Sequence, residues 1–169
     1  EQHHADDARA AGCAEHQHPL VILHERRCHA GERPFTRRHG IGLATAQAFA
    51  KEGARLVITG RSQNNLENAV QKIQGEVLAI QASASDLNDI ERMLEQTVER
   101  FGPIDVMFLN AGPGGVQARI EEVTEAIFDG FCDTNFKGPF FTIQKALPHL
   151  ADNASIILCS SISNAIGQV

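Results

Sequence analysis

The 169-residue sequence contains no tyrosine, so no phenol is available within it to exchange a proton. Its four cysteines, Cys13, Cys28, Cys132 and Cys159, lack the short paired spacing of redox or zinc motifs. No apolar run is long enough for a membrane helix, and the polar, acidic first ten residues do not resemble a signal peptide. These absences predict a cytoplasmic chain with no membrane partner.

An excess of basic residues is also missing, because 21 acidic residues outnumber 15 basic ones and leave a net charge of -6. Nucleic acids and anionic membranes bind clustered positive surface, so neither partner is expected. Hydrophobic residues make up 43% of the sequence, which is enough to build the core of one domain. We therefore expect a small-molecule partner.

The composition changes near residue 39. Seven of the eight histidines and six arginines precede Gly40, where there is no lysine and a single short apolar run at residues 20–23. From Ile41 onward, apolar residues follow helix and strand periods. We therefore treat residues 1–38 as an atypical segment and residues 39–169 as the domain.

The leading segment has three interpretations. It could be a metal-binding arm built on Cys13, His16, His18 and the pair Cys28–His29, but no second pair stands at a zinc-finger spacing. It could be a disordered extension of the protein. We favour an out-of-frame translation or a damaged gene end, which explains why an Arg- and His-rich stretch meets an ordinary domain without a linker. No metal site is therefore predicted.

Apolar periodicity in the rest of the chain predicts alternating helices and strands. The first helix spans residues 41–51, carries Leu43, Ala46 and Ala50 on one face, and is followed by the capping residue Gly53. Strands are predicted at residues 55–59, 77–80, 104–109 and 156–159. Helical stripes run from Leu66 to Ile73, from Ile90 to Phe101 after the capping candidate Asp86, and from Ile143 through Ala146 and Leu147 to Leu150. Asp152–Asn153 is predicted to turn the chain into the last strand. This alternation predicts an α/β fold with a Rossmann-like, doubly wound parallel sheet.

Ligands of such sheets bind at the carboxyl ends of the strands. The residues expected there are Gly40 to Gly42, Gly60–Arg61, Ser83, Asn110 to Gly112 and Ser160–Ser161. The glycines of Gly40–Ile41–Gly42 let the backbone approach a pyrophosphate, which the amides and dipole of the following helix attract. We therefore interpret this edge as a dinucleotide site.

The residue pair after the second of these strand ends indicates which cofactor is bound. An enzyme that uses NAD is expected to place a carboxylate there, on the ribose 2′-hydroxyl, but this chain has Gly60 and Arg61. A guanidinium can donate two parallel hydrogen bonds to a 2′-phosphate. NADP(H) is therefore favoured and NAD(H) stays possible, the alternative being that Arg61 merely caps a strand in solvent.

Taken together, the glycine segment, Asn110–Ala111–Gly112, Asn135 within residues 133–138, and Ser161 resemble the motif series of the short-chain dehydrogenase/reductase family. The resemblance extends from Gly40 to Val169. It implies that Gly40, Ile41 and Gly42 bind the pyrophosphate and that the Asn-Ala-Gly triplet supports the sheet beside the adenosine ribose. It further implies a homo-oligomeric parent enzyme in which Asn135 and Ser161 join a tyrosine and a lysine to transfer hydride between nicotinamide and a carbonyl or alcohol substrate.

The sequence departs from the family pattern at several points. Phe35 and Thr36 stand where a threonine and the first glycine belong, Ser83 stands where an aspartate reads adenine, and the first strand is not recognisable. The Tyr-x-x-x-Lys motif and the last two strands have no counterpart after Ser161. We therefore expect an incomplete fold that is inactive as it stands, with a non-catalytic dinucleotide-binding or interaction module, or a pseudogene product, as the alternative.

Each candidate residue also has a purely structural interpretation. Asn110 could satisfy neighbouring loop amides, Asn135 could fill a helix kink, and Ser161 could end a strand.

Overall fold

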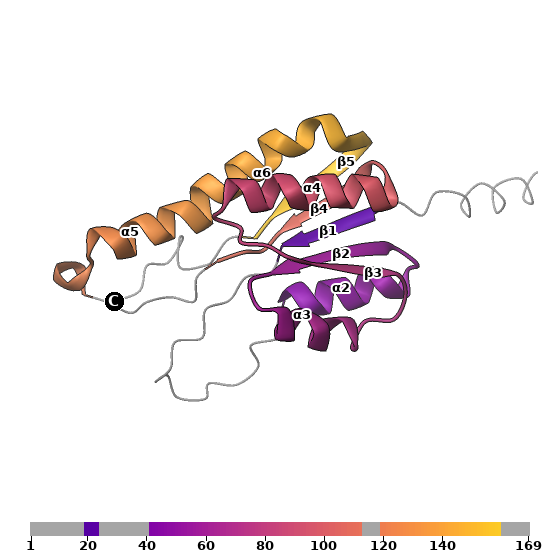
Figure 1. Cartoon of the computed structure of the whole chain (residues 1–169), viewed down its shortest axis with the longest axis horizontal. Helices are drawn as coiled ribbons and strands as arrows, with labels where there is room; N and C mark the ends of the chain where they lie inside the picture. Colours follow the sequence, from indigo (N-terminus) through magenta and orange to yellow (C-terminus); the bar gives the residue numbers. More distant parts are fainter. Residues whose placement is uncertain (1–18, 24–40, 113–118, 160–169) are drawn as a thin grey trace, which may run out of the picture.

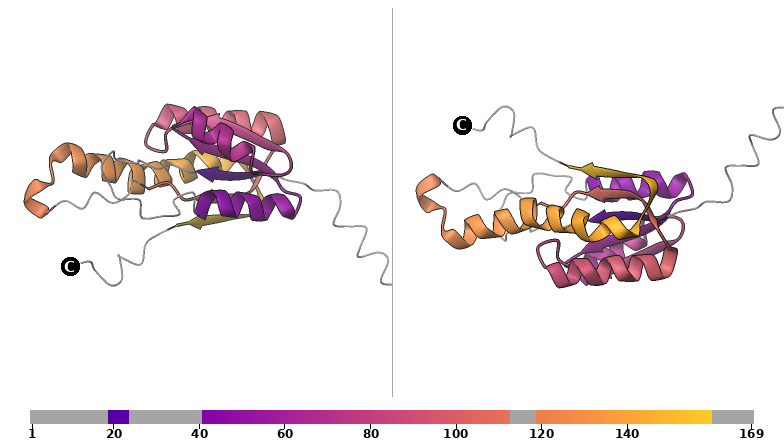
Figure 2. Two further views of the ribbon diagram at one scale, coloured as in Figure 1. Left: turned by 90° about the horizontal axis from the view of Figure 1, so that it is seen from below. Right: turned by 90° about the horizontal axis from the view of Figure 1, so that it is seen from above.

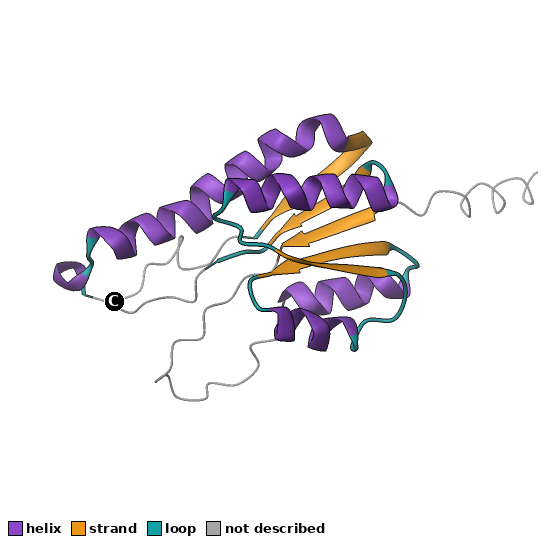
Figure 3. Cartoon of the chain, in the orientation of Figure 1, coloured by secondary structure: helices purple, strands orange, loops and turns teal. Residues whose placement is uncertain are grey.

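A computed structural model describes residues 19–23, 41–112 and 119–159 of the chain. Within these ranges, five parallel strands form one sheet in the order β3-β2-β1-β4-β5. The strands are β1 (Pro19–Leu23), β2 (Arg55–Gly60), β3 (Val77–Gln81), β4 (Ile104–Leu109) and β5 (Leu150–Leu158). Helices cover both faces of this sheet (Figure 3). The predicted doubly wound parallel fold is therefore confirmed.

The helices alternate with the strands along the chain. They are α2 (Ile41–Lys51), α3 (Gln63–Val70), α4 (Leu87–Phe101), η1 (Ile120–Glu122), α5 (Glu125–Cys132), the π-helix η2 (Asp133–Lys137), α6 (Gly138–Ala146) and η3 (Leu147–His149). In Figure 1, α4 and α6 lie on one side of the sheet, and α2 and α3 lie on the other.

Strand β1 corrects one expectation. The apolar run at residues 20–23 forms this strand, which pairs in parallel with β2 on one side and β4 on the other. The prediction that the first strand cannot be recognised was therefore wrong. Four consecutive apolar residues show neither helix nor strand periodicity, so the sequence alone does not identify them as a strand. Pairing with two distant strands places them in the middle of the sheet. The sheet thus uses residues on both sides of the boundary expected at residue 39.

Two apolar cores hold the layers together. Along β2, Val57 faces the core under α4 and α6, whereas Leu56 and Ile58 face the core under α2 and α3. Along β4, Met107 and Phe108 divide between the two cores in the same way. Because both faces of these strands are buried, their sequences are continuous apolar runs rather than alternating ones.

Two predicted helix boundaries are confirmed by their caps. Asp86 begins α4, where its Oδ1 accepts hydrogen bonds from the backbone amides of Asn88 at 2.9 Å and Asp89 at 3.2 Å. Gly53 follows α2 with a φ of 82°, a conformation that suits glycine. Local side-chain chemistry was sufficient to place both ends.

The segment leading into the last strand differs from the expectation. Leu147 does not join the buried stripe, because it is 60% exposed within η3. Strand β5 begins at Leu150 rather than Ile156, and it pairs with β4 through an irregularity, since Ile104 faces Leu150 while Val106 faces Ser155. Asn153, expected in a turn before the strand, lies inside this irregularity with a φ of 72°.

Helices α5 and α6 run through η2 as one long rod. Figures 1 and 2 show that the α6 end lies over the sheet while the α5 end projects past the carboxyl ends of the strands. Beside α4, the Lys145 ammonium of α6 lies 3.5 Å from the Glu91 carboxylate. The π-helix lies beside the loops that follow β3 and β4, since Asn135 is next to Gly112 and Gly138 is next to Ala84.

Candidate functional site

The amino end of α2 lies at the carboxyl edge of the sheet. The helix begins at Ile41, as predicted, and Gly42 is buried in its first turn. Residues 41–44 include no acidic side chain, so no carboxylate of the first turn competes for its backbone amides. Such an end attracts an anion through its amides and the helix dipole. Gly40, the other predicted glycine, lies outside the described residues.

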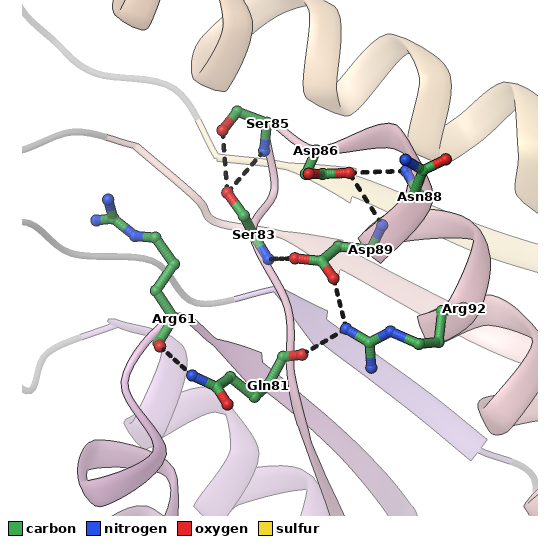
Figure 4. A network of polar contacts seen from close by, with 8 residues as sticks. All are labelled: Arg61, Gln81, Ser83, Ser85, Asp86, Asn88, Asp89 and Arg92. Atoms are coloured by element: carbon green, nitrogen blue, oxygen red, sulfur yellow. Dashed lines mark hydrogen bonds and ion pairs between the residues drawn. The ribbon is translucent and has the colours of Figure 1, made fainter.

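Arg61 follows β2 directly, as the sequence predicted. Its side chain is half-buried, and burial lowers the pKa of the guanidinium from its ordinary value. A guanidinium nevertheless stays charged at neutral pH. Its backbone carbonyl accepts a 2.9 Å hydrogen bond from Gln81 Nε2, and Figure 4 shows the side chain extending away from that bond. The end of β2 therefore carries one positively charged side chain, and a hydrogen bond from Gln81 holds the backbone of that residue.

Ser83 lies in the loop after β3, within a network of polar contacts (Figure 4). Its amide donates to Asp89 Oδ2 at 2.9 Å, and its hydroxyl lies 3.0 Å from the Ser85 hydroxyl. Asp89 also pairs with Arg92 one turn later on α4. The pKa of Asp89 is lowered mainly by the Ser83 amide and then by its hydrogen bond to Arg92. Both partners stabilise the ionised carboxylate.

Sequence reasoning identified Ser83 and Arg61 but missed the three side chains that connect their loops: Gln81, Asp89 and Arg92. An available signal was the i, i+3 spacing of Asp89 and Arg92 just after the capping residue Asp86. Gln81 gave no signal, because an exposed glutamine at a strand end is unremarkable until its partner is known.

The structure brings two predicted segments together next to β4. A Cβ atom added to Gly112 would lie 3.4 Å from Asn135 Oδ1, so the Asn110–Gly112 triplet contacts the π-helix. Asn110 and Ala111 are half-buried in the same triplet. Asn135 is exposed, and its Nδ2 donates to the Phe131 carbonyl at 3.1 Å. These residues lie far apart in the sequence and adjacent in the fold.

Asn135 lies in an irregular helical turn. The Gly138 amide donates to the Asp133 carbonyl five residues earlier, which is the hydrogen bond of a π-helix. Asn135 therefore lies in a local irregularity of the helix, which is compatible with its structural interpretation. This interpretation does not compete with a functional role, since π-turns recur at functional sites and this one directs Asn135 towards Gly112.

The rod and the loop after β3 meet at Gly138. A Cβ atom there would lie 2.0 Å from the Ala84 carbonyl oxygen, so no larger residue fits without a backbone shift. Thr142, fully buried one turn later, donates from its hydroxyl to the Gly138 carbonyl at 2.8 Å. The loops after β3 and β4 and the π-helix therefore converge on one corner of the sheet.

Several predicted residues stay untested. Ser160, Ser161, Phe35, Thr36 and the candidate ligands of the metal-binding arm lie outside the described residues. Within the described ranges, no group of three His, Cys, Asp or Glu residues could hold a metal ion. Among the helices described, none combines the length and the apolar character needed to cross a bilayer.

Comparisons with known proteins give a consistent result. Residues 37–168 match the sequence pattern of the family described as short chain dehydrogenase. Tropinone reductase-like 3 of Erythroxylum coca is 34% identical over 127 residues, which are 73% of this chain and 49% of that protein. Dehydrogenase/reductase SDR family member 4 of Homo sapiens is 32% identical over 129 residues, which are 73% of this chain and 46% of that protein.

Solved protein structures with a similar fold support the same family. The crystal structure of levodione reductase has 28% sequence identity and a TM-score of 0.76, over 90% of this chain and 57% of that one. The chain spans about half the length of the curated relatives it matches.

Proposed function

The chain belongs to the short-chain dehydrogenase family, and we propose that it forms the cofactor-binding part of an NADP(H)-preferring oxidoreductase. The observation that carries this proposal is which residues lie at the strand-end edge, the edge of the sheet formed by the carboxyl ends of its strands. The amino end of α2, Arg61, and the Gly112–Asn135 contact all lie at the carboxyl ends of parallel strands. This is where doubly wound sheets bind dinucleotides.

The described residues fit such a cofactor. Gly42 and the amino end of α2 suit a pyrophosphate, which needs close backbone approach without an acidic side chain in the first turn. Arg61, at the end of β2, supplies a permanent positive charge for a ribose 2′-phosphate. Asn110, Ala111 and Gly112 would line the sheet beside the ribose. When bound, the nicotinamide would donate a hydride to a carbonyl carbon in its reduced form, or accept one from an alcohol carbon in its oxidised form.

In this proposal Asn135 and Ser161 orient groups around the reacting oxygen. Ser161 would donate to the substrate oxygen, and Asn135 would hold a water through its exposed amide. The proton itself requires a phenol, which these 169 residues do not contain. We therefore propose that the 169-residue chain alone does not catalyse hydride transfer. A small-molecule substrate and a homo-oligomeric, cytoplasmic parent enzyme remain part of the proposal.

A second candidate is a non-catalytic dinucleotide-binding or interaction module derived from the same family. The two differ in the gene beyond the codon for Val169. Tyrosine and lysine codons four positions apart in frame support the enzyme, whereas an immediate stop codon supports the module.

Catalytic inactivity can be tested directly. The purified chain is mixed with NADPH and a panel of aldehydes and ketones, and absorbance at the nicotinamide band is followed. No steady oxidation is expected. Oxidation that disappears in Ser161→Ala would contradict the requirement for a phenol.

Cofactor preference is tested through the adenosine end. Adenosine 2′,5′-bisphosphate and 5′-AMP differ by the 2′-phosphate, so the ratio of their dissociation constants isolates its contribution. A partly exposed charge-assisted pair corresponds to a preference of about ten- to a hundredfold for the bisphosphate, reduced as salt rises. Arg61→Ala should abolish this preference and leave 5′-AMP affinity nearly unchanged.

The matched control is Arg119→Ala, which removes the same charge from an exposed residue paired with Glu121. It should leave the ratio unchanged. Equal affinities of the unaltered chain for the two nucleotides at low salt would refute the NADP(H) preference.

A further inference from the structure

The ends of β2 and β3 are joined by side chains as well as by the sheet. The last backbone bond between them runs from the Ala82 amide to the Gly60 carbonyl at 3.0 Å. At the next residue, Gln81 Nε2 donates to the Arg61 carbonyl at 2.9 Å. A side-chain amide thus extends the pairing of the two strands by one residue, up to the residue whose side chain carries the charge.

Gln81 is itself held in place. The Arg92 guanidinium donates to the Gln81 carbonyl at 2.8 Å and pairs with Asp89. The other oxygen of Asp89 accepts the Ser83 amide at 2.9 Å. Figure 4 shows these contacts as one chain of bonds that leads from Arg61 through Gln81, Arg92 and Asp89 to Ser83. Helix α4, through Asp89 and Arg92, therefore fixes both loops.

The consequence falls on the direction of the Arg61 side chain. A hydrogen bond that fixes the Arg61 carbonyl also restricts the backbone conformation of Arg61. That conformation limits the positions that the guanidinium can reach. In Figure 4 the side chain leaves the backbone on the side opposite the Gln81 bond. Without that bond, Arg61 would keep its charge, but its side chain would sample more orientations. The guanidinium would then spend less time in the orientation that pairs with a ligand phosphate.

We propose that Gln81 is a positioning residue that sets nucleotide selectivity by holding the Arg61 backbone, with Arg92 and Asp89 holding Gln81. The inference rests on the proposed function, because it assumes that Arg61 binds the 2′-phosphate. Ser83 and Arg61 belong to neighbouring strand ends, so one network would set the spacing of both contacts to the adenosine end of the cofactor.

The test compares two glutamines. Gln81→Met keeps the length of the side chain, removes the donor and adds no charge. Gln47→Met is the matched control, since Gln47 Nε2 also donates 2.9 Å to a backbone carbonyl, that of Lys72, but at another place in the fold. For both variants and the unaltered chain, the measurements are the thermal midpoint and the dissociation constants for adenosine 2′,5′-bisphosphate and 5′-AMP.

We expect the two variants to have similar thermal midpoints. The bisphosphate preference should fall about two- to tenfold in Gln81→Met, the range of one partly exposed hydrogen bond, and stay unchanged in Gln47→Met. In an Arg61→Ala background, Gln81→Met should change the ratio no further, because the two residues act through the same phosphate.

The remaining outcomes separate the two proposals. An unaltered preference in Gln81→Met, in a chain whose preference requires Arg61, overturns the role of Gln81 and leaves the proposed function standing. A variant that binds both nucleotides more weakly by the same factor has lost a structural bond, which also overturns the inference. A chain with no preference at all refutes the NADP(H) proposal, and this inference fails with it.

Discussion

The two corners of the strand-end edge are held by different means. At the corner between β2 and β3, the loops are connected by hydrogen bonds of the exposed Gln81 and Arg92 and the partly buried Asp89. At the corner between β3 and α6, the backbone of Gly138 lies against the Ala84 carbonyl with no room for a side chain. Substitutions at the first corner can change its polar groups, whereas the tight backbone contact at the second corner fixes the positions of the loops.

The physical difference is exposure. Hydrogen bonds at the exposed corner exchange with water, so each contributes little net stability and acts mainly on orientation. Contacts at the buried corner exclude water and transmit strain, because a packed interior has no spare volume. Substitutions at the buried corner should therefore act first on folding and change binding only through it, and those at the exposed corner should affect mainly binding or pH dependence.

The largest effect is expected for Gly138→Ala. The added methyl group would lie 2.0 Å from the Ala84 carbonyl oxygen, a backbone atom that cannot rotate away. We expect the free energy of unfolding, measured by denaturant titration, to fall by about 3 kcal/mol or more. In the control Gly130→Ala, in α5, the Cβ meets nothing within 4 Å, and helix propensity should raise stability by about 0.5–1 kcal/mol. Equal behaviour of the two variants would mean that the corner is not sterically closed.

A smaller effect is expected for Thr142→Val, which removes the hydroxyl that donates to the Gly138 carbonyl at 2.8 Å. Its counterpart Thr97→Val, in α4, removes an equally buried hydroxyl that donates to the Met93 carbonyl at 2.7 Å. Each variant should lose about 1 kcal/mol in the same titration. Only Thr142→Val should also weaken 5′-AMP binding, because its bond lies beside the contact between Gly138 and Ala84. Unchanged affinity in both would place that contact outside the nucleotide site.

The smallest effect belongs to the exposed corner and depends on pH. The Ser83 amide and Arg92 lower the folded-state pKa of Asp89 below 3.8, so ionised Asp89 stabilises the fold above that pH. The stability difference between the unaltered chain and Asp89→Asn should be about 1 kcal/mol or less at neutral pH. It should shrink as pH falls from 3.8 through the lowered pKa. Glu95→Gln, an exposed change on the same helix, serves as control, and a pH-independent difference for Asp89→Asn would exclude this linkage.

Much of the fold could be predicted from local sequence. The periods of α2 and α4, the cap at Asp86 and the glycine after α2 depend on neighbouring residues, and each lies where the sequence indicated. The ends of β2 and β3 could be predicted from the same periods, and with them the positions of Arg61 and Ser83. The prediction failed at β1 and at the start of β5, where pairing with distant strands overrides weak or interrupted local patterns.

The sequence by itself determined the alternation of helices and strands and the identity of the residues at the carboxyl edge, because periodicity and capping are local. The tertiary structure alone decided that Asn135 meets Gly112, that Gly138 meets Ala84, and that Gln81 holds Arg61. These contacts join residues 20 or more positions apart. Nothing in the spacing of such residues encodes the contact, because it exists only after two core layers have set the distance between the loops.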